Sequence, residues 1–448
     1  MSSEWQHFKV ADLQARGWLL VEDGNHGEYR PRPDEFTQDG VSFIRAADMA
    51  NGEVLFGSAQ RINSIAKARI RKGIGQPGDI LLSHKGTVGK LALVPEKCPD
   101  YVCSPQTTFW RVLDESVLDR HFLYAYMRSR VFTLQLASRK GETDMADYVS
   151  LTAQRQLMLP VPPMNVQRMI GQVTHVIDSR IRLLHKTNAT LESIAQALFK
   201  SWFVDFDPVR AKQEGRAPEG MDEATAALFP DGFEESELGM VPKGWRITTL
   251  EELCSVITNG GTPSRSKAEF WQEGSIPWFK TGEFADGFLL SPSERITPSA
   301  LESSSVKLLP KDAILMAIYA APTVGRLGIL TEPAAFNQAC TGMVAKPEIG
   351  PWFLFLVLYF GRDWFNSRAN GAAQQNISKA IVTTYKLVRP SDAVLLRLND
   401  IIGSIFESIR ANSSKAQTLT ELRDRLLPRL ISGQLRLPDA EALIEEAA

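Results

Sequence analysis

Two long stretches of the chain carry apolar residues that recur alternately three and four positions apart. This alternation is typical of a coiled-coil helix, because it keeps one apolar stripe facing a partner. No Gly or Pro interrupts residues 172–207 or 404–427. We expect two helices, at 164–205 and 391–432, each spanning about 60 Å. The predicted stripe residues are Val166, Ile170, Val173, Ile177, Ile181, Leu184, Leu191, Ile194 and Leu198 in the first helix, and Leu398, Ile402, Ile405, Ile409, Ala416, Leu419, Leu422 and Leu426 in the second.

Two helices of matched length in one chain can pair with each other. The alternative is a pair of separate amphipathic helices, each lying on its own domain. A single domain seldom offers a surface about 60 Å long, which favours pairing.

The segment before each helix has the pattern of an α+β domain. Short runs of β-forming residues alternate with turns rich in Gly and Pro, and each segment contains one helical stretch. In the first segment, strands are predicted at 41–45, 79–83 and 91–94, and a helix at 119–130. In the second segment, strands are predicted at 312–319 and 327–330, and a helix at 352–360.

The chain repeats itself with an offset that falls from 240 to 228 residues. An internal repeat means that one structural unit is present twice. We therefore expect α+β domains at 1–163 and 242–390, each followed by its helix. The matches that run in order are Trp5 and Leu13 with Trp245 and Leu253, Phe43-Ile44-Arg45 with Trp278-Phe279-Lys280, Asn51-Gly52 with Asp286-Gly287, Pro77 and Asp79 with Pro310 and Asp312, Thr87–Lys90 with Thr323–Arg326, and Thr190-Leu191 with Thr418-Leu419.

Charge is distributed unevenly. The 448 residues include 50 Lys and Arg and 52 Asp and Glu, a formal charge of −2. A connector at 206–241 and a tail at 433–448 are acidic. Residues 204–241 hold ten acidic and three basic side chains, and residues 438–448 hold four acidic and none basic. The rest of the chain therefore carries +9. Its charge is compatible with a polyanionic partner.

Several functional classes are excluded by missing motifs. The four cysteines form no C-x-x-C pair and no zinc spacing, so a metal site is not expected. Residues 85–91 resemble a phosphate loop only weakly, because His84 replaces its first glycine and Leu91 its Ser or Thr. No nucleophile elbow or H-E-x-x-H is present. The N-terminal ten residues lack the apolar core of a signal peptide, and residues 352–360 are too short to span a membrane. A cytoplasmic protein without catalytic residues is expected.

Basic and amide side chains beside predicted turns are the candidate DNA contacts. Lys and Arg bind phosphates, while Arg, Asn and Gln also read base edges. For any single residue the pattern favours an ordinary solvated surface role, so the argument rests on the group. The candidates are Arg45, Arg61, Lys85, Lys90, Arg139 and Lys140 in the first domain, and Lys280, Arg326, Arg368, Gln374 and Gln375 in the second.

Three motifs resemble the specificity (S) subunits of type I restriction–modification systems. The resemblance covers nearly the whole chain and agrees with the duplication and the helices. The motifs are 198–212 (LFKSWFVDFDPVRAK) with 228–231 and 236–245, then 257–264 (ITNGGTPS) with 276–278, and 422–433 (LRDRLLPRLISG).

Two positions depart from the family pattern. The family's Pro-Pro-x-x-Glu-Gln entry to each helix has Val166 in place of Glu in the first copy, and only Pro390 remains in the second. The opening of the first domain at 24–27 (GNHG) also differs from 258–263 (TNGGTP) in the second. We therefore expect different helix entries and different target sequences for the two domains.

The resemblance implies a fold and a set of partners. The fold would be α+β, with two target recognition domains and two long helices paired as an antiparallel coiled coil with pseudo-twofold symmetry. Each domain would bind one half of a bipartite, asymmetric site in double-stranded DNA. The helices would set the spacer, on the order of one DNA turn of about 34 Å, and would dock two modification subunits. Those subunits would use S-adenosylmethionine, and restriction subunits would use ATP and Mg²⁺. This chain would bind no cofactor.

Two other functions remain open at the level of sequence. A stand-alone enzyme with a cryptic site would act without partners, although the missing motifs argue against it. A coiled-coil scaffold that binds protein would bind its partner without the steep salt dependence that phosphate contacts produce.

Overall fold

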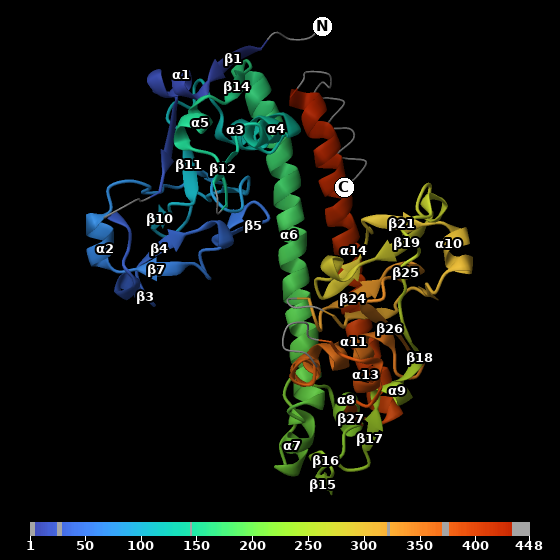
Figure 1. Cartoon of the computed structure of the whole chain (residues 1–448). Helices are drawn as coiled ribbons and strands as arrows, with labels where there is room; N and C mark the ends of the chain where they lie inside the picture. Colours follow the sequence, from blue (N-terminus) through green and yellow to red (C-terminus); the bar gives the residue numbers. More distant parts are fainter. Residues whose placement is uncertain (1–4, 25–28, 144–145, 320–322, 370–375, 432–448) are drawn as a thin grey trace. The chain divides into compact units, whose positions relative to one another are not determined.

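The protein is described by a computed structural model that covers residues 5–24, 29–143, 146–319, 323–369 and 376–431 (Figure 1). It forms two compact units, Met1–Arg182 with Gln417–Ala448, and Leu183–Ala416. Both long helices contribute to both units. None of the described helices is long and apolar enough to cross a membrane.

The domain part of the first unit is built on two four-stranded sheets. Residues of both sheets, among them Ile44, Leu81 and Phe109, form one buried core. The first sheet has the order β10 (Tyr101–Cys103), β4 (Val41–Ile44), β7 (Gln60–Ile62) and β3 (Phe36–Thr37). The second has the order β2 (Leu19–Asp23), β11 (Thr107–Val112), β8 (Ile80–Ser83) and β9 (Leu91–Leu93). The shorter pairs are β1 (Gln6–Lys9) with β14 (Met158–Val161), β5 (Met49–Ala50) with β6 (Glu53–Val54), and β12 (Gly141–Thr143) with β13 (Ala146–Tyr148).

Helices of the first unit cover these sheets. The predicted helix at 119–130 is divided in two, because Ser129 leaves the helical conformation and its hydroxyl accepts a hydrogen bond from the Phe132 amide at 3.3 Å. The hydroxyl therefore acts as the cap of a new helix. The helices are α1 (Val10–Ala15), α2 (Ser64–Arg69), α3 (Arg120–Met127), α4 (Arg130–Ala137) and α5 (Leu151–Arg155), with 3₁₀ turns η2 (Pro33–Glu35) and η3 (Ala46–Asp48).

The second unit contains a domain of the same plan. Its four-stranded sheet has the order β22 (Leu308–Leu309), β25 (Ala334–Phe336), β19 (Ile276–Phe279) and β21 (Glu294–Ile296). Its five-stranded sheet has the order β18 (Cys254–Asn259), β26 (Cys340–Ala345), β23 (Ile314–Ala317), β24 (Leu327–Leu330) and β20 (Gly287–Leu289). β17 (Arg246–Thr249) pairs with β27 (Lys386–Arg389). The helices are α9 (Leu250–Leu253), α10 (Pro298–Ser303), α11 (Pro351–Phe360), α12 (Arg362–Ser367) and α13 (Lys379–Thr383), with 3₁₀ turns η4 (Ala268–Phe270) and η5 (Thr281–Glu283).

Strand pairing confirms the internal repeat. β4 runs parallel to β10 in the first unit, as β19 does to β25 in the second. Each domain is closed by an antiparallel pair of its first and last strands, β1 with β14 and β17 with β27. After β4 the Arg45 amide donates to Asp48 at 2.9 Å, and after β19 the Lys280 amide donates to Glu283 at 2.6 Å. The strands predicted at 41–45, 79–83, 91–94, 312–319 and 327–330 are all present.

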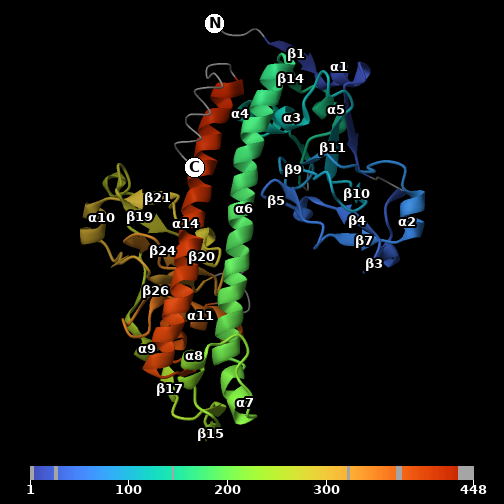
Figure 2. The same ribbon diagram turned by 180° about the vertical axis from the view of Figure 1, so that it is seen from behind.

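The two long helices are α6 (Met164–Phe203) and α14 (Asp392–Ile431), each of 40 residues. In each unit the stretch of α14 runs antiparallel beside the stretch of α6 (Figures 1 and 2). In the second unit the buried Asn188 amide donates to the Ile409 carbonyl at 3.2 Å and to the Ser413 hydroxyl at 2.9 Å. The predicted stripe residues that are buried are Ile170, Val173, Ile177, Ile181 and Leu184, with Leu398, Ile402, Ile409, Ala416, Leu419 and Leu426.

The buried stripe departs from the predicted one near the end of α6. Ile194 is 50% exposed, so its assignment to the seam is wrong, and Ala195 is buried in its place. Leu191 and Ile405 are only partly buried. The reason is that each helix also lies on the second domain. Phe199 of α6 stacks on Phe360 of α11, with 5.3 Å between ring centroids. The pairing that the sequence favoured is therefore confirmed over two separate helices, and the paired helices also contact the second domain.

The acidic connector is a folded part of the second unit. It contains α7 (Asp207–Gln213), α8 (Glu223–Ala227) and a hairpin of β15 (Phe233–Ser236) with β16 (Gly239–Pro242). Phe229 is buried and packs edge-on against Trp202 of α6, with centroids 5.0 Å apart. The Lys212 ammonium donates to the Phe229 carbonyl at 2.5 Å. Apolar anchors therefore fix a segment whose charge alone would favour a loose connector.

Candidate nucleic-acid interface

A sharp turn after β8 places Lys85 beside the β12–β13 hairpin. Lys85 forms an isolated antiparallel bridge with Tyr148, and the Gly86 amide donates to the Asp147 carbonyl at 3.0 Å. The exposed Lys85 ammonium lies 6.0 Å from the centre of the Tyr148 ring. On the hairpin itself, Lys140 pairs with the Asp147 carboxylate at 2.7 Å. The fold thus brings Lys85 and Lys140 to one edge of the first domain. The Tyr148 ring lies beside Lys85 at this edge.

Arg139 lies at the base of this hairpin with its guanidinium already engaged. It donates to the Gln135 and Gln156 carbonyls, both at 3.1 Å. These hydrogen bonds to main-chain carbonyls hold the guanidinium against the base of the hairpin, so it does not project freely into solvent. A role in phosphate contact stays a prediction for this residue.

Arg45 and Lys90 meet at a second corner of the first domain. Arg45 forms a bidentate pair with Asp48, at 3.0 and 3.3 Å, and the Lys90 ammonium donates to the Ala46 carbonyl at 3.0 Å. Arg61 lies on β7, where its guanidinium donates to the Gln38 carbonyl at 3.3 Å. The six first-domain candidates therefore divide into the Lys85 edge, the Arg45 corner and Arg61.

The corresponding turn of the second domain has different side chains. Tyr319 occupies the bridge position of Lys85 and pairs with Asn376. The half-buried Arg326 follows the turn, whose Gly325 carbonyl accepts from Arg362 at 2.9 Å. Arg368 is exposed, and its guanidinium lies 4.0 Å from the centre of the Trp364 ring. Gln374 and Gln375 lie outside the described residues.

A stacked Arg–Trp pair is the feature that the candidate list missed. The Arg265 guanidinium lies 3.7 Å from the centre of the Trp271 ring, and Trp271 donates from its indole to the Ser264 carbonyl at 3.1 Å. Arg265 and the predicted residue Lys280 both pair with Glu294, Lys280 at 2.7 Å. Two cations around one carboxylate leave a net positive charge on an exposed edge. Arg265 and Glu294 are far apart in sequence, so a local sequence pattern could not predict this cluster.

Both cations lower the pKa of Glu294 to about 2, with the Arg265 hydrogen bond as the largest cause. The folded-state pKa is below the unfolded value, so the pair stabilises the fold above about pH 4.5 and this contribution is lost as pH falls toward 2. We expect Glu294→Gln to lower the free energy of unfolding by about 1 kcal/mol at pH 7, a value reduced by solvent screening. The difference should shrink below pH 4 in urea titrations. Glu269→Gln, at an exposed site nearby, is the control, and a difference independent of pH would contradict the assignment.

Among the described residues, no three His, Cys, Asp or Glu side chains converge on a point where they could hold a metal ion. Cys103, Cys254 and Cys340 are buried free thiols, and Cys98 is half-buried. The pKa of the Cys103 and Cys340 thiols is raised by burial, which keeps them protonated and unreactive. What the domains present to a partner is therefore charge, amides and aromatic rings, and these are groups that bind phosphates and bases.

Comparisons with known proteins identify the chain. The family model for the type I restriction modification DNA specificity domain matches residues 3–193 and 242–423, once in each half. A type I restriction enzyme HindI specificity subunit from Haemophilus influenzae is 27% identical over 97% of this chain and 100% of its own length. The MjaIX specificity subunit of Methanocaldococcus jannaschii is 22% identical over 90% and 89%.

The fold has a solved counterpart. The type I restriction–modification S subunit from M. genitalium matches with a TM-score of 0.54 at 15% identity, over 95% of this chain and 96% of that one. Two specificity domains in one chain also account for the absence of recognisable catalytic motifs in the sequence. The chain therefore belongs to the type I restriction–modification DNA specificity family, as a non-catalytic specificity subunit with two DNA-recognition domains.

Proposed function

We propose that each recognition domain binds one half of a bipartite, asymmetric DNA site, and that the α6–α14 pair sets the spacer between the halves. The observation that carries this proposal is the contrast at equivalent turns. One fold occurs twice, but Lys85 and Tyr148 form the bridge in the first copy and Tyr319 and Asn376 in the second. A cation and a phenol offer different hydrogen bonds from a phenol and an amide. Two copies that differ there are suited to two different sequences.

The helices are proposed to dock two modification subunits as well. Those partners would supply S-adenosylmethionine and methylate adenine after flipping the base out of the duplex. Restriction subunits that use ATP and Mg²⁺ would complete the complex, in the cytoplasm. This chain would contribute recognition alone. Exposed Val176, Leu183 and Ile194 are apolar side chains of α6 that a partner could cover.

A methylome of the host with and without the gene tests the function directly. We expect one bipartite adenine-methylated motif to disappear when the gene is deleted, which would give both half-sites and the spacer. Methylation unchanged by deletion, in a host that carries modification subunits, would contradict the proposal.

The half-site assignment is tested by substitutions in the two domains. We expect Lys85→Ala to weaken binding through the first half-site by about threefold to tenfold and to reduce the salt slope by about one, as the loss of a phosphate contact does. Lys280→Ala and Arg326→Ala should weaken the second half-site by a similar factor. Measurement is by fluorescence anisotropy, with duplexes in which one half-site at a time is scrambled.

Lys97→Ala, at an exposed site of the first domain outside the candidate set, is the matched control for Lys85→Ala. Arg139→Ala is less informative, because it also removes two hydrogen bonds to main-chain carbonyls. If Lys85→Ala weakened both half-sites equally, the two domains would not be independent readers.

A further inference from the structure

Equivalent joints hold each recognition domain to a long helix. Because α6 and α14 are both 40 residues long, Asp178 and Phe406 occupy the same position, the fifteenth, in their helices. By the same correspondence Arg182 of α6 matches Arg410 of α14. The domain side of each joint is formed by α3 in the first unit and α11 in the second. The two joints can therefore be compared residue by residue.

The joint of the second unit is mainly aromatic, with one ion pair between Arg410 and Asp312 beside the rings. Trp352 of α11 stacks face to face on Phe406, with ring centroids 4.7 Å apart and planes 3° from parallel. Phe355 and Phe288 meet the same Phe406 ring edge-on, at 5.6 and 6.4 Å. The Arg410 guanidinium lies 4.9 Å from the centre of the Phe288 ring and also pairs with Asp312 of the domain and with Glu407 at 3.0 Å. A hollow lined by Phe288, Phe406 and Ile409 has a volume of about 20 Å³. Close packing of this kind permits one arrangement.

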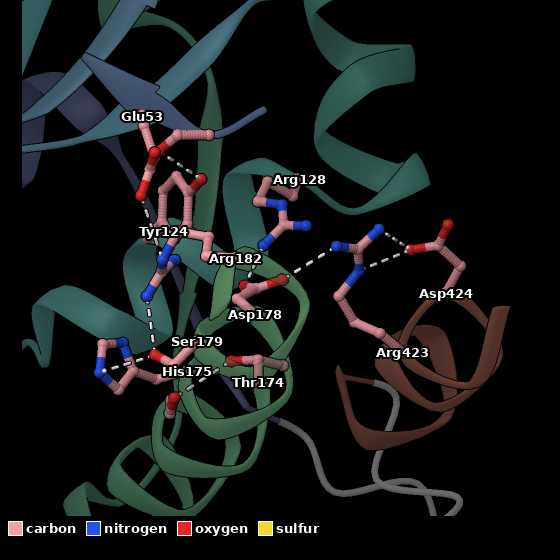
Figure 3. Close-up of polar contacts among 12 residues, drawn as sticks. Glu53, Tyr124, Arg128, Thr174, His175, Asp178, Ser179, Arg182, Arg423 and Asp424 are labelled. Atoms are coloured by element: carbon pink, nitrogen blue, oxygen red, sulfur yellow. Dashed lines mark hydrogen bonds and ion pairs between the residues drawn. The ribbon is translucent and has the colours of Figure 1, made fainter. Parts of the chain in front are cut away.

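The joint of the first unit is ionic. Asp178, 9% exposed, pairs with Arg128, which caps the C-terminal end of α3, and with Arg423 of α14 at 2.9 Å (Figure 3). Both guanidiniums are largely buried, 20% and 15% exposed. Arg182 pairs with Glu53 of β6 at 3.4 Å and donates to the Ser179 hydroxyl at 2.7 Å. A single carboxylate thus connects the domain to both helices.

Polar groups fill this first joint less completely than rings fill the second. Glu53 is the counterpart of Phe288, because each directly follows the glycine of its turn. His121 is the counterpart of Trp352, because each is the second residue of its helix. His121 and His175 face each other with ring centroids 4.4 Å apart. A hollow of about 410 Å³ lies beside them, lined by Glu53, Glu96, Arg120, His121, His175 and Arg182. Space of this size leaves the ion pairs room to change partners.

We propose that Asp178 is a positioning residue for DNA recognition: through Arg128 and Arg423 it fixes the first recognition domain on the helix pair, at a joint that is adjustable where the second is rigid. Loss of this carboxylate removes the ion pair of the buried Arg128 guanidinium and leaves Arg423 with the exposed Asp424 alone, which is strongly unfavourable for Arg128. The domain then takes other orientations on the helices. Since the helix pair is proposed to set the spacer, the distance and rotation between the two half-sites that the chain can bind are then no longer fixed. The DNA part of this inference rests on the proposed function.

Hydrogen exchange of the free full-length chain tests the joint without DNA. We expect Asp178→Asn to raise exchange of the α3 amides about tenfold or more, and to leave those of α11 unchanged. Asp178→Glu, which keeps the charge, should restore most of the protection. Asp424→Asn is the matched control, because it removes the other carboxylate on Arg423 and leaves Arg128 paired. Unchanged α3 exchange in Asp178→Asn would overturn the proposal.

Spacer discrimination tests the consequence for recognition. With the site known from the methylome, duplexes with the natural spacer and with one base pair more or fewer are compared by binding affinity. We expect the preference for the natural spacer to fall about fivefold or more in Asp178→Asn and to stay within twofold of wild type in Asp178→Glu and Asp424→Asn. Wild-type discrimination in Asp178→Asn would overturn the positioning role. A wild type that binds no bipartite site would refute the proposed function, and the exchange of α3 would still decide whether Asp178 fixes the domain.

A second pair of variants covers the case in which Asp178→Asn does not fold. Glu53→Arg places two cations together at a more exposed part of the joint, where Glu53 is 54% and Arg182 29% exposed. We expect it to reduce spacer discrimination, and the double variant Glu53→Arg with Arg182→Glu to recover it. Equal loss in the single and double variants would show that the ion pair does not position the domain.

Discussion

Ile177→Lys is expected to lower the free energy of unfolding of the first unit by several kcal/mol. Ile177 lies in the middle of α6 and is 1% exposed. An ammonium at this position either stays unpaired in an apolar seam or separates the helices so that it can reach water. The neighbouring Asp178 is already occupied by Arg128 and Arg423, so it cannot also compensate a lysine without losing one of them. Chemical denaturation followed by far-ultraviolet circular dichroism measures the loss.

Val176→Lys is the matched control for this variant. Val176 precedes Ile177 in the same helix, has the same β-branched character and is 55% exposed. The same new charge at this position should change the free energy of unfolding by less than about 0.5 kcal/mol. Methylation of the bipartite site should fail with Ile177→Lys. Equal stability of the two variants, with wild-type methylation by both, would contradict a buried seam.

Most of the helix seam could be predicted from the sequence because its pattern is local. Spacing of three and four residues fixes one face of a helix, and Ile170 to Leu184 are buried as the spacing requires. The prediction failed at Ile194, where α6 also packs on aromatic rings of the second domain. Ala195, Phe199 and Trp202 are buried there instead. That change of face is set by contacts with residues more than 150 positions away, such as Phe353, which no local period encodes.

The candidate DNA-contacting residues could be predicted only as a class. Counting basic residues near turns identifies Lys85, Lys140 and Lys280, but it does not show which of them share a surface. The grouping of Lys85 with Lys140 depends on the register of β12 with β13 and on the bridge to Tyr148. Trp271 carries no charge and was missed, although its ring supports Arg265. Contacts between loops form only when the sheets have folded. Such contacts produce no regular spacing of residues in the sequence, so they cannot be predicted from it.

Phe406→Ala is expected to cost about 3–5 kcal/mol, the range for removing a buried phenylalanine side chain. Phe406 is 4% exposed and contacts three rings, of which Trp352 stacks parallel to it with ring centroids 4.7 Å apart. Truncation leaves a cavity between α14 and α11 that neither helix can close without separating Arg410 from the Phe288 and Trp352 rings, over which it lies at 4.9 and 5.5 Å. Differential scanning calorimetry and hydrogen exchange of the α11 amides measure the effect.

The adjacent position supplies the control and distinguishes the structure from the sequence pattern. The apolar spacing placed Ile405 in the seam, whereas the structure buries Phe406 and leaves Ile405 partly exposed. We therefore expect Ile405→Ala to cost less than half as much as Phe406→Ala. Equal costs would mean that α14 presents the face predicted by the spacing.

A large effect of Phe406→Ala on α11, with α3 unaffected, would show that the aromatic joint stabilises its own domain independently of the ionic one. In that case a defect in one recognition domain would leave the other able to bind its half-site, and binding to duplexes that carry a single half-site would measure this.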